Sequence, residues 1–206
     1  MRAGSYCLPT NAAHAPGRPE PSCSRGASLR LQEAWLAEAR GDAAEERRLL
    51  EEFVHRVLVE SPNRLTGLVH LAWVAFRQGD IQAAVATCAE SLKFQRRLGP
   101  SRFLPAVLNV LALAGEHSGL LTLSARLSAT IAAIKGQPNL ISAGMVHLQE
   151  EQAAAVERVR VALGERAFAA AWAAGERLSA DAAIEFGLEA VAELQQVFAK
   201  NTAAER

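Results

Sequence analysis

Hydrophobic side chains recur every three or four residues along most of this chain, a spacing typical of amphipathic helices. The clearest example is residues 68–98, LVHLAWVAFRQGDIQAAVATCAESLKFQRRL, which predict two helices that meet at Gly79 and Asp80. Gly79 can adopt the left-handed conformation that closes a helix, and Asp80 can accept hydrogen bonds from the first amides of the next one. The pattern therefore predicts a helical hairpin.

The same pattern precedes and follows this stretch, so we expect three hairpins over residues 28–141. Their turns are centred on Gly41, Gly79 and Gly119, which stand 38 and 40 residues apart. A helix pair that recurs at such a period indicates a solenoid of stacked hairpins.

Local signals set the expected helix ends. Ser28 offers an N-cap for the first helix, and Ser61-Pro62-Asn63 is expected to end the second, because proline disfavours helical geometry at the residue before it. The six predicted helices cover residues 29–40, 43–60, 68–78, 81–98, 106–117 and 121–135.

The two ends of the chain differ from this repeating part. Residues 1–27 contain four prolines and show no helical or strand period, which predicts a disordered tail. Residues 142–206 predict three further helices: one from about Gly144 to Leu163, a short one carrying Phe168 and Trp172, and a last one capped by Ser179. We interpret them as a C-terminal cap, because the last apolar face of a solenoid must be covered.

Composition favours an all-α protein. Half of the residues are hydrophobic but only 5% are aromatic, and strong helix formers dominate the middle of the chain. The 22 basic and 22 acidic residues balance, so the whole surface has no field that attracts nucleic acid or an anionic membrane. The longest run without a charged residue or a histidine, residues 103–115, is shorter than the roughly 20 residues that cross a bilayer. We therefore expect neither direct nucleic-acid binding nor membrane association.

The residues that carry most enzyme chemistry are scattered. Cys7, Cys23 and Cys88 show no C-x-x-C spacing, which favours reduced thiols in a cytoplasmic protein. The five histidines form no H-x-x-x-H or H-E-x-x-H set, and Asp42 and Asp80 stand at predicted helix starts. We therefore expect no metal, no cofactor and no catalytic residues.

Residues of the 68–98 hairpin resemble the signature positions of a tetratricopeptide repeat. The matching residues are Leu71, Ala72, Ala75, Gly79, Asp80, Ala84, Cys88 and Ser91. The period here exceeds the usual 34 residues, and in this it resembles the longer-looped repeats of bacterial signalling ATPases and of maltose-regulon transcription activators. The resemblance implies a right-handed tetratricopeptide-like solenoid of helix-turn-helix pairs.

Residues 156–188, VERVRVALGERAFAAAWAAGERLSADAAIEFGL, resemble the segment that ends the helical repeats in LuxR-type regulators and related nucleotide-binding ATPases. In those relatives an ATPase module precedes the repeats and a DNA reader stands at one end. This chain has no G-x-x-x-x-G-K-[ST] phosphate loop, so the resemblance implies a sensory or coupling portion of a regulator and carries over neither activity. Whether the chain is a complete protein or a truncated piece stays open.

Two groups of residues are candidates for binding. Trp35 and Trp73 take equivalent places in successive hairpins, and with Phe76 they could line a concave groove for a protein or peptide. The alternative is that both tryptophans belong to the core between repeats. Lys93, Arg96, Arg97 and Arg102 form the one positive cluster, expected to complement a helix C-terminus and, as a second reading, to contact an anion.

The sequence therefore predicts a non-enzymatic protein-interaction or sensor module, the C-terminal repeat portion of a transcriptional or signalling regulator. Two alternatives remain: a subunit of a DNA-binding regulator that acts with a separate reader or ATPase chain, and a helical small-molecule sensor or enzyme. The second alternative needs a deep pocket with convergent polar groups. Partner identity, regulated genes and oligomeric state do not follow from the sequence.

Overall fold

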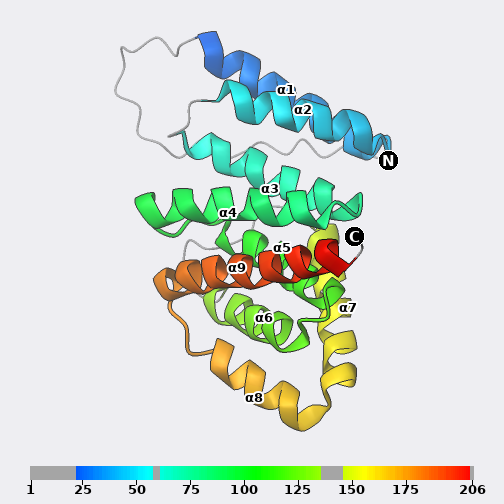
Figure 1. Cartoon of the computed structure of the whole chain (residues 1–206). Helices are drawn as coiled ribbons and strands as arrows, with labels where there is room; N and C mark the ends of the chain where they lie inside the picture. Colours follow the sequence, from blue (N-terminus) through cyan, green and yellow to red (C-terminus); the bar gives the residue numbers. More distant parts are fainter. Residues whose placement is uncertain (1–21, 58–60, 136–145, 205–206) are drawn as a thin grey trace, which may run out of the picture.

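The structure, a computed structural model, describes residues 22–57, 61–135 and 146–204, and all regular structure in these ranges is helical (Figure 1). In chain order the helices are α1 (Ser22–Ala39), α2 (Ala43–Arg56), α3 (Pro62–Arg77), α4 (Ile81–Leu98), α5 (Leu104–His117), α6 (Leu121–Lys135), α7 (Val146–Leu163), α8 (Glu165–Gly175) and α9 (Ala180–Ala204). The all-α prediction is confirmed for the described residues.

The helices α1 to α6 form three hairpins whose turns share one geometry. At the second turn Gly79 has φ +78°, and the amide of Asp80 donates to the carbonyl of Ala75 at 2.9 Å. This six-to-one hydrogen bond is the Schellman motif, which requires a residue in the left-handed region and so favours glycine. The turns at Gly41 and Gly119 repeat the positive φ and the same bond. The three predicted turns are confirmed.

The aspartates that follow two of these turns cap the next helices. The Asp42 side chain accepts from the amide of Glu45, and the Asp80 side chain accepts from the amide of Ala83, both at 3.1 Å. Both aspartates thus satisfy amides that have no partner inside the helix. The third turn has Leu120 in this place, and α6 begins at Leu121 without such a cap.

Several predicted helix ends were wrong. Helix α1 begins at Ser22, before the predicted cap Ser28, so part of the predicted tail is helical; residues 1–21 lie outside the described residues. Helix α2 ends at Arg56, and Ser61-Pro62, taken as its stop signal, starts α3. Ser61 is the N-cap of α3 and Pro62 its first residue, where the missing amide costs nothing because no partner is available there.

Helix α5 lies at the centre of the molecule. Every residue from Leu104 to Gly115 is buried, because α3, α4, α6, α7 and α9 all pack against this helix. Consistent with that position, its sequence is apolar around the whole circumference rather than on one stripe. Its one buried amide side chain, Asn109, donates to the carbonyl of Leu148 in α7 at 3.1 Å.

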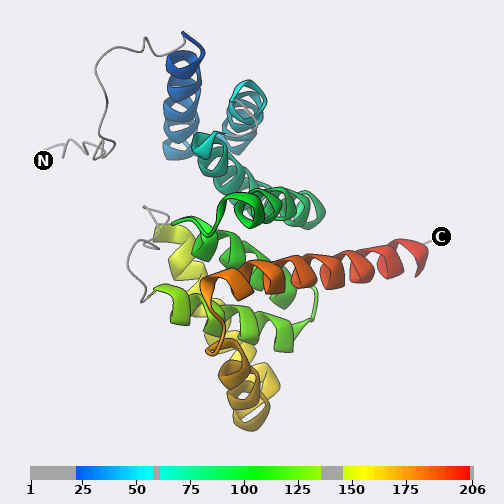
Figure 2. The same cartoon turned by 90° about the vertical axis from the view of Figure 1, so that its left-hand side faces the viewer.

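The three C-terminal helices do not simply continue the stack. Helix α8 packs along α6, and α7 crosses both α5 and α6 (Figure 1). Helix α9 returns to the middle of the molecule and packs on α4 and α5, as the turned view in Figure 2 also shows. Gly187 permits this approach, since a Cβ there would lie 2.9 Å from side-chain atoms of Leu92 and Leu108. The predicted cap is therefore also part of the central core.

The first hairpin is attached to the rest by a smaller interface. Its apolar clusters, around Phe53 and Leu50, are separate from the large cluster formed by α3 to α7 and α9. Two ion pairs reinforce the junction: Arg47 binds Asp80 at 2.9 Å, and Arg77 binds Glu46 at 2.5 Å.

Among the described helices, none combines the length and the apolar character that crossing a membrane requires.

Candidate functional site on the first two hairpins

The side chain of Trp35 lies between α1 and α3 and is open on one side. Its ring centroid is 6.0 Å from that of His70, with the rings inclined at 57°. The side chain keeps 36% of its surface exposed. An aromatic ring that packs against a neighbour and keeps part of its surface exposed is suited to contact with a partner molecule.

Trp73, the equivalent residue of the second hairpin, belongs to the core instead. Only 6% of its surface is exposed, and it stacks on Phe76 with the centroids 5.9 Å apart. The Arg77 guanidinium lies 5.7 Å from its ring centroid. Of the three predicted contact residues, Phe76 is half-buried against the main core, so Trp35 is the one that the structure leaves open.

Charged groups surround these rings at the junction of α1, α2 and α3. The Glu46 carboxylate is buried and accepts a 2.5 Å hydrogen bond from Arg77. Burial raises the pKa of Glu46, and the Arg77 guanidinium opposes that shift. Burial also lowers the pKa of His70, with Glu38 opposing and Arg77 reinforcing the shift. Near pH 7 the imidazole of His70 is therefore neutral.

We call the surface formed by Trp35, Glu38, His70, Trp73 and Arg77 the α1–α3 face. It combines one open indole, one half-buried carboxylate, a neutral imidazole and a guanidinium already held by Glu46. Such a set offers an aromatic surface together with hydrogen-bond donors and acceptors. In the described part of the chain, no group of histidine, cysteine, aspartate or glutamate residues is placed to hold a metal ion.

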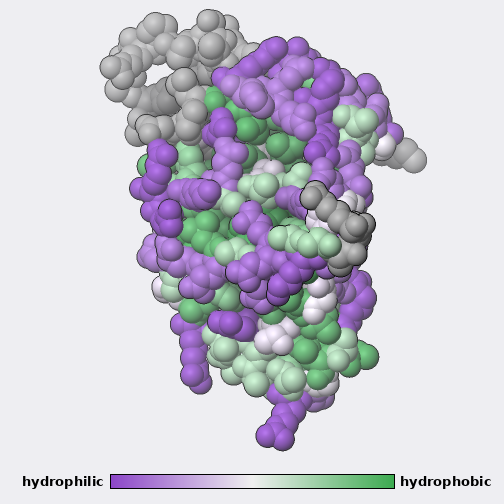
Figure 3. Space-filling view, viewed as in Figure 1, coloured by the Kyte–Doolittle hydropathy of each residue, from purple (hydrophilic) through white to green (hydrophobic). Residues whose placement is uncertain are grey.

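The outer surface of α1 and α2 is covered by ion pairs and is largely hydrophilic (Figure 3). Arg30 binds Glu33 at 2.7 Å and Arg48 binds Glu45 at 2.6 Å, and Arg48 also pairs with Glu52. Exposed pairs of this kind contribute little to stability. They leave the α1–α3 face as the part of this hairpin where an aromatic ring is open.

The predicted basic cluster lies at the end of α4 and in the loop that follows. Arg96 lies 3.8 Å from Glu185 of α9, and the Arg102 guanidinium lies 4.8 Å from the ring centroid of Phe103. Lys93 and Arg97 are exposed on the same end of α4. Because α9 runs antiparallel to α4, its acidic first turns meet this end, a pairing that the sequence spacing alone did not reveal.

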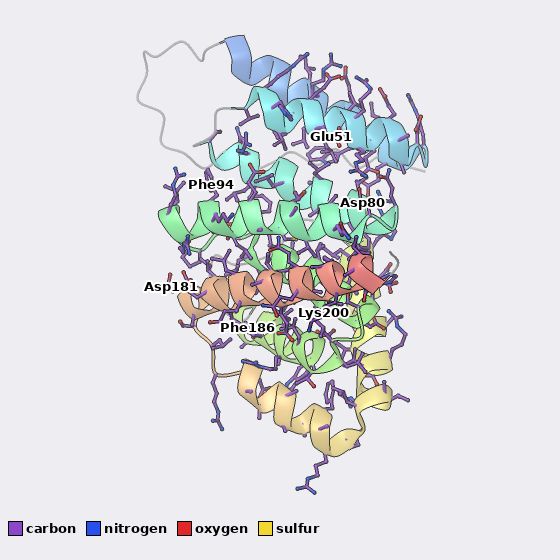
Figure 4. All side chains as sticks on the ribbon, viewed as in Figure 1. Glu51, Asp80, Phe94, Asp181, Phe186 and Lys200 are labelled. Atoms are coloured by element: carbon purple, nitrogen blue, oxygen red, sulfur yellow. The ribbon has the colours of Figure 1, made fainter. Side chains whose placement is uncertain are left out.

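At the opposite end of the same helix pair lies an open groove of about 880 Å³. Figure 4 shows Asp80 and Lys200 at this end and Phe94 and Asp181 at the other. The groove is lined by alanines of α4 and α9 and by Phe198, together with the polar residues Asp80, Gln82, Gln195 and Thr202. The groove is open to solvent, whereas small-molecule sites usually enclose most of the ligand.

Sequence reasoning found Trp35 but missed Glu38, His70 and Glu46. One signal for Glu38 was present, because it follows Trp35 by three residues and so lies on the same side of the helix. The other two come from different helices, and nothing in the sequence told which faces of α2 and α3 meet α1.

Comparisons with known proteins add no relative. A scan against protein-family models found no match, and searches of curated proteins and of solved structures found no significant match.

Proposed function

We propose that this chain is a non-enzymatic protein-interaction module that binds a partner segment on the α1–α3 face. The observation that carries the proposal is the open indole of Trp35, held against His70 with 36% of its surface exposed. Partly exposed tryptophans next to polar groups are frequent hot spots of protein interfaces, since a large rigid ring buries much area with little loss of entropy.

Packing in the rest of the molecule supports the choice of this face. The first helices of the hairpins are α1, α3 and α5, and these would form the binding surface of a tetratricopeptide-like solenoid. Helix α5 is enclosed by its neighbours over residues 104–115 and offers no surface to a partner. Among these three helices, open surface is left on α1 and on the adjoining side of α3.

At the level of the fold, we propose a right-handed tetratricopeptide-like solenoid with a C-terminal helical cap, serving as the repeat portion of a LuxR-type or related regulator. The repeated Schellman turns at Gly41, Gly79 and Gly119 support the repeat interpretation. The return of α9 to α4 and α5 is a departure from simple stacking, and it joins the second and third hairpins with α7 and α9 in one core.

The proposal is tested by panning a random peptide display library against the purified protein. Enriched peptides are then synthesised and titrated by fluorescence anisotropy against wild type, Trp35→Ala and Leu98→Ala. Leu98 is also an exposed hydrophobic residue but lies at the end of α4. We expect Trp35→Ala to weaken binding by about tenfold or more, and Leu98→Ala to leave it unchanged.

Circular dichroism and thermal unfolding verify that both variants are folded. A library that yields no binding peptide contradicts an interaction module of this kind. Peptides whose affinity is the same for wild type and folded Trp35→Ala place the binding surface elsewhere.

A further inference from the structure

The position three residues before each turn glycine can be compared across the three hairpins. It is held by Glu38, Phe76 and Glu116 in the three hairpins. In the third hairpin, Arg158 of α7 binds the Glu116 carboxylate through two hydrogen bonds: Nε to Oε1 at 2.5 Å and Nη2 to Oε2 at 2.9 Å. In the third hairpin, the helix that follows thus supplies a bidentate arginine to the carboxylate at this position.

The first hairpin lacks such an arginine. The helix after it, α3, brings His70 and Arg77 to this region, but the Arg77 guanidinium is bound to Glu46 at 2.5 Å. His70 is held neutral because its pKa is lowered. Across residues 22–57, 61–135 and 146–204, no cationic side chain forms an ion pair with Glu38.

Trp35 stands beside this carboxylate on the same side of α1, one turn earlier, with its indole open. A planar guanidinium can stack on an indole and at the same time donate two parallel hydrogen bonds to a carboxylate. A lysine ammonium is a point charge and cannot make the bidentate contact. The pair of side chains is therefore matched to arginine in particular.

We propose that the α1–α3 face binds a peptide segment through an arginine side chain, placed against the Trp35 indole and paired with the Glu38 carboxylate. This inference rests on the proposed function, because it names the chemistry of the segment bound on the same face. The arginine takes at Glu38 the part that Arg158 takes at Glu116.

The test uses three peptide display libraries, each with a single fixed central residue, arginine, lysine or glutamate, and random flanks. Panned against the purified protein, the arginine library should give the strongest enrichment and the glutamate library none. For the synthesised arginine peptides, we expect Glu38→Gln and Trp35→Ala each to weaken binding by about tenfold or more, since a charge-assisted hydrogen bond is lost in one and the stacking surface in the other. Binding should also weaken with added salt.

The control is Glu193→Gln, which removes the same charge from an exposed position on α9 and should leave affinity unchanged. Peptides that need Trp35 but bind equally well without arginine, or to Glu38→Gln, refute the arginine anchor and leave the interaction module standing. Failure of every library to yield a ligand refutes both.

Discussion

Trp35 and Trp73 hold equivalent positions in successive hairpins, yet Trp73 is buried and Trp35 is partly exposed. Trp73 is covered by the packing of α3 onto the main core and stacks on Phe76. Trp35 has only His70 of α3 as an aromatic neighbour and keeps a third of its surface exposed. One residue type at one repeat position thus stabilises the fold in one hairpin and is available for binding in the other.

This difference predicts different stabilities for the two alanine variants. Trp73→Ala should lower the free energy of unfolding by about 3–5 kcal/mol, the usual loss when a buried tryptophan is truncated. Trp35→Ala should lower it by about 1 kcal/mol or less, because much of that ring stays in water in the folded state. Urea denaturation followed by circular dichroism measures both. Equal losses in the two variants are incompatible with the difference in burial.

His70 should make stability depend on pH. Its folded-state pKa lies below the unfolded value of about 6.5, so the unfolded chain binds the proton more readily than the folded one. The free energy of unfolding should therefore fall as the pH drops from about 6.5 toward the folded-state pKa, in proportion to that shift.

Urea denaturation between pH 7.5 and 5.5 measures this slope, and His70→Asn should reduce it. His117→Asn, which changes an exposed histidine at the end of α5, serves as the control and should preserve it. A His70→Asn slope equal to that of wild type would falsify the assignment to His70.

At the scale of elements, glycines inside helices decide how closely the C-terminal helices approach the hairpins. Gly175, the last residue of α8, lies against α6: a Cβ there would overlap the carbonyl oxygen of Arg126 and lie 2.8 Å from the Cβ of Ala129. The Gly175 carbonyl also accepts a 3.2 Å hydrogen bond from Thr130. The contact is between backbones, which cannot move aside as a side chain can.

Gly175→Ala should therefore destabilise the protein by about 3 kcal/mol, at the upper end of the range for overpacking. Gly119→Ala provides the comparison, because a Cβ at that turn meets no atom within 4 Å and only the left-handed backbone is disfavoured, by about 1 kcal/mol. Thermal unfolding measures which of the two variants loses more stability. Should Gly119→Ala be the more harmful, the close approach of α8 to α6 is not as described.

Helix positions were the most predictable part of this fold. The predicted range of α6 was right at both ends, and Ser179 accepts from the amide of Ala182 at the start of α9 as expected. Such signals are local, because caps and turn glycines act within one turn of the helix. Ser61-Pro62 was assigned the wrong role since a proline after a helix and a proline that begins one give the same sequence pattern.

Helix partners were much less predictable. An apolar stripe shows that one side of α9 is buried, but it does not show that α4 and α5 are what it meets. The candidate site has the same limit: Trp35 is visible in the sequence, whereas its contact with His70 depends on the packing of α1 against α3. Long-range packing depends on several helices together, so the local pattern of one helix does not predict which helices it contacts.

For the whole molecule, stability should decrease from the centre toward the first hairpin. Helix α5 is buried on all sides, whereas α1 packs mainly on α2, in clusters separate from the main core. In native-state hydrogen exchange measured by mass spectrometry, α5 should exchange most slowly and α1 and α2 considerably faster, because local opening exposes regions with few long-range contacts first. Equal protection of α1 and α5 is the result that contradicts a separable first hairpin.

The return of α9 to α4 and α5 has a consequence for the order of events during synthesis. Ala183, Ala190 and Leu194 complete the central core, yet they are translated after all eight of the other described helices. While the ribosome is still making α9, the apolar side of α4 that α9 will cover stays in contact with water or with a chaperone. The central core is therefore complete only after α9 has been made.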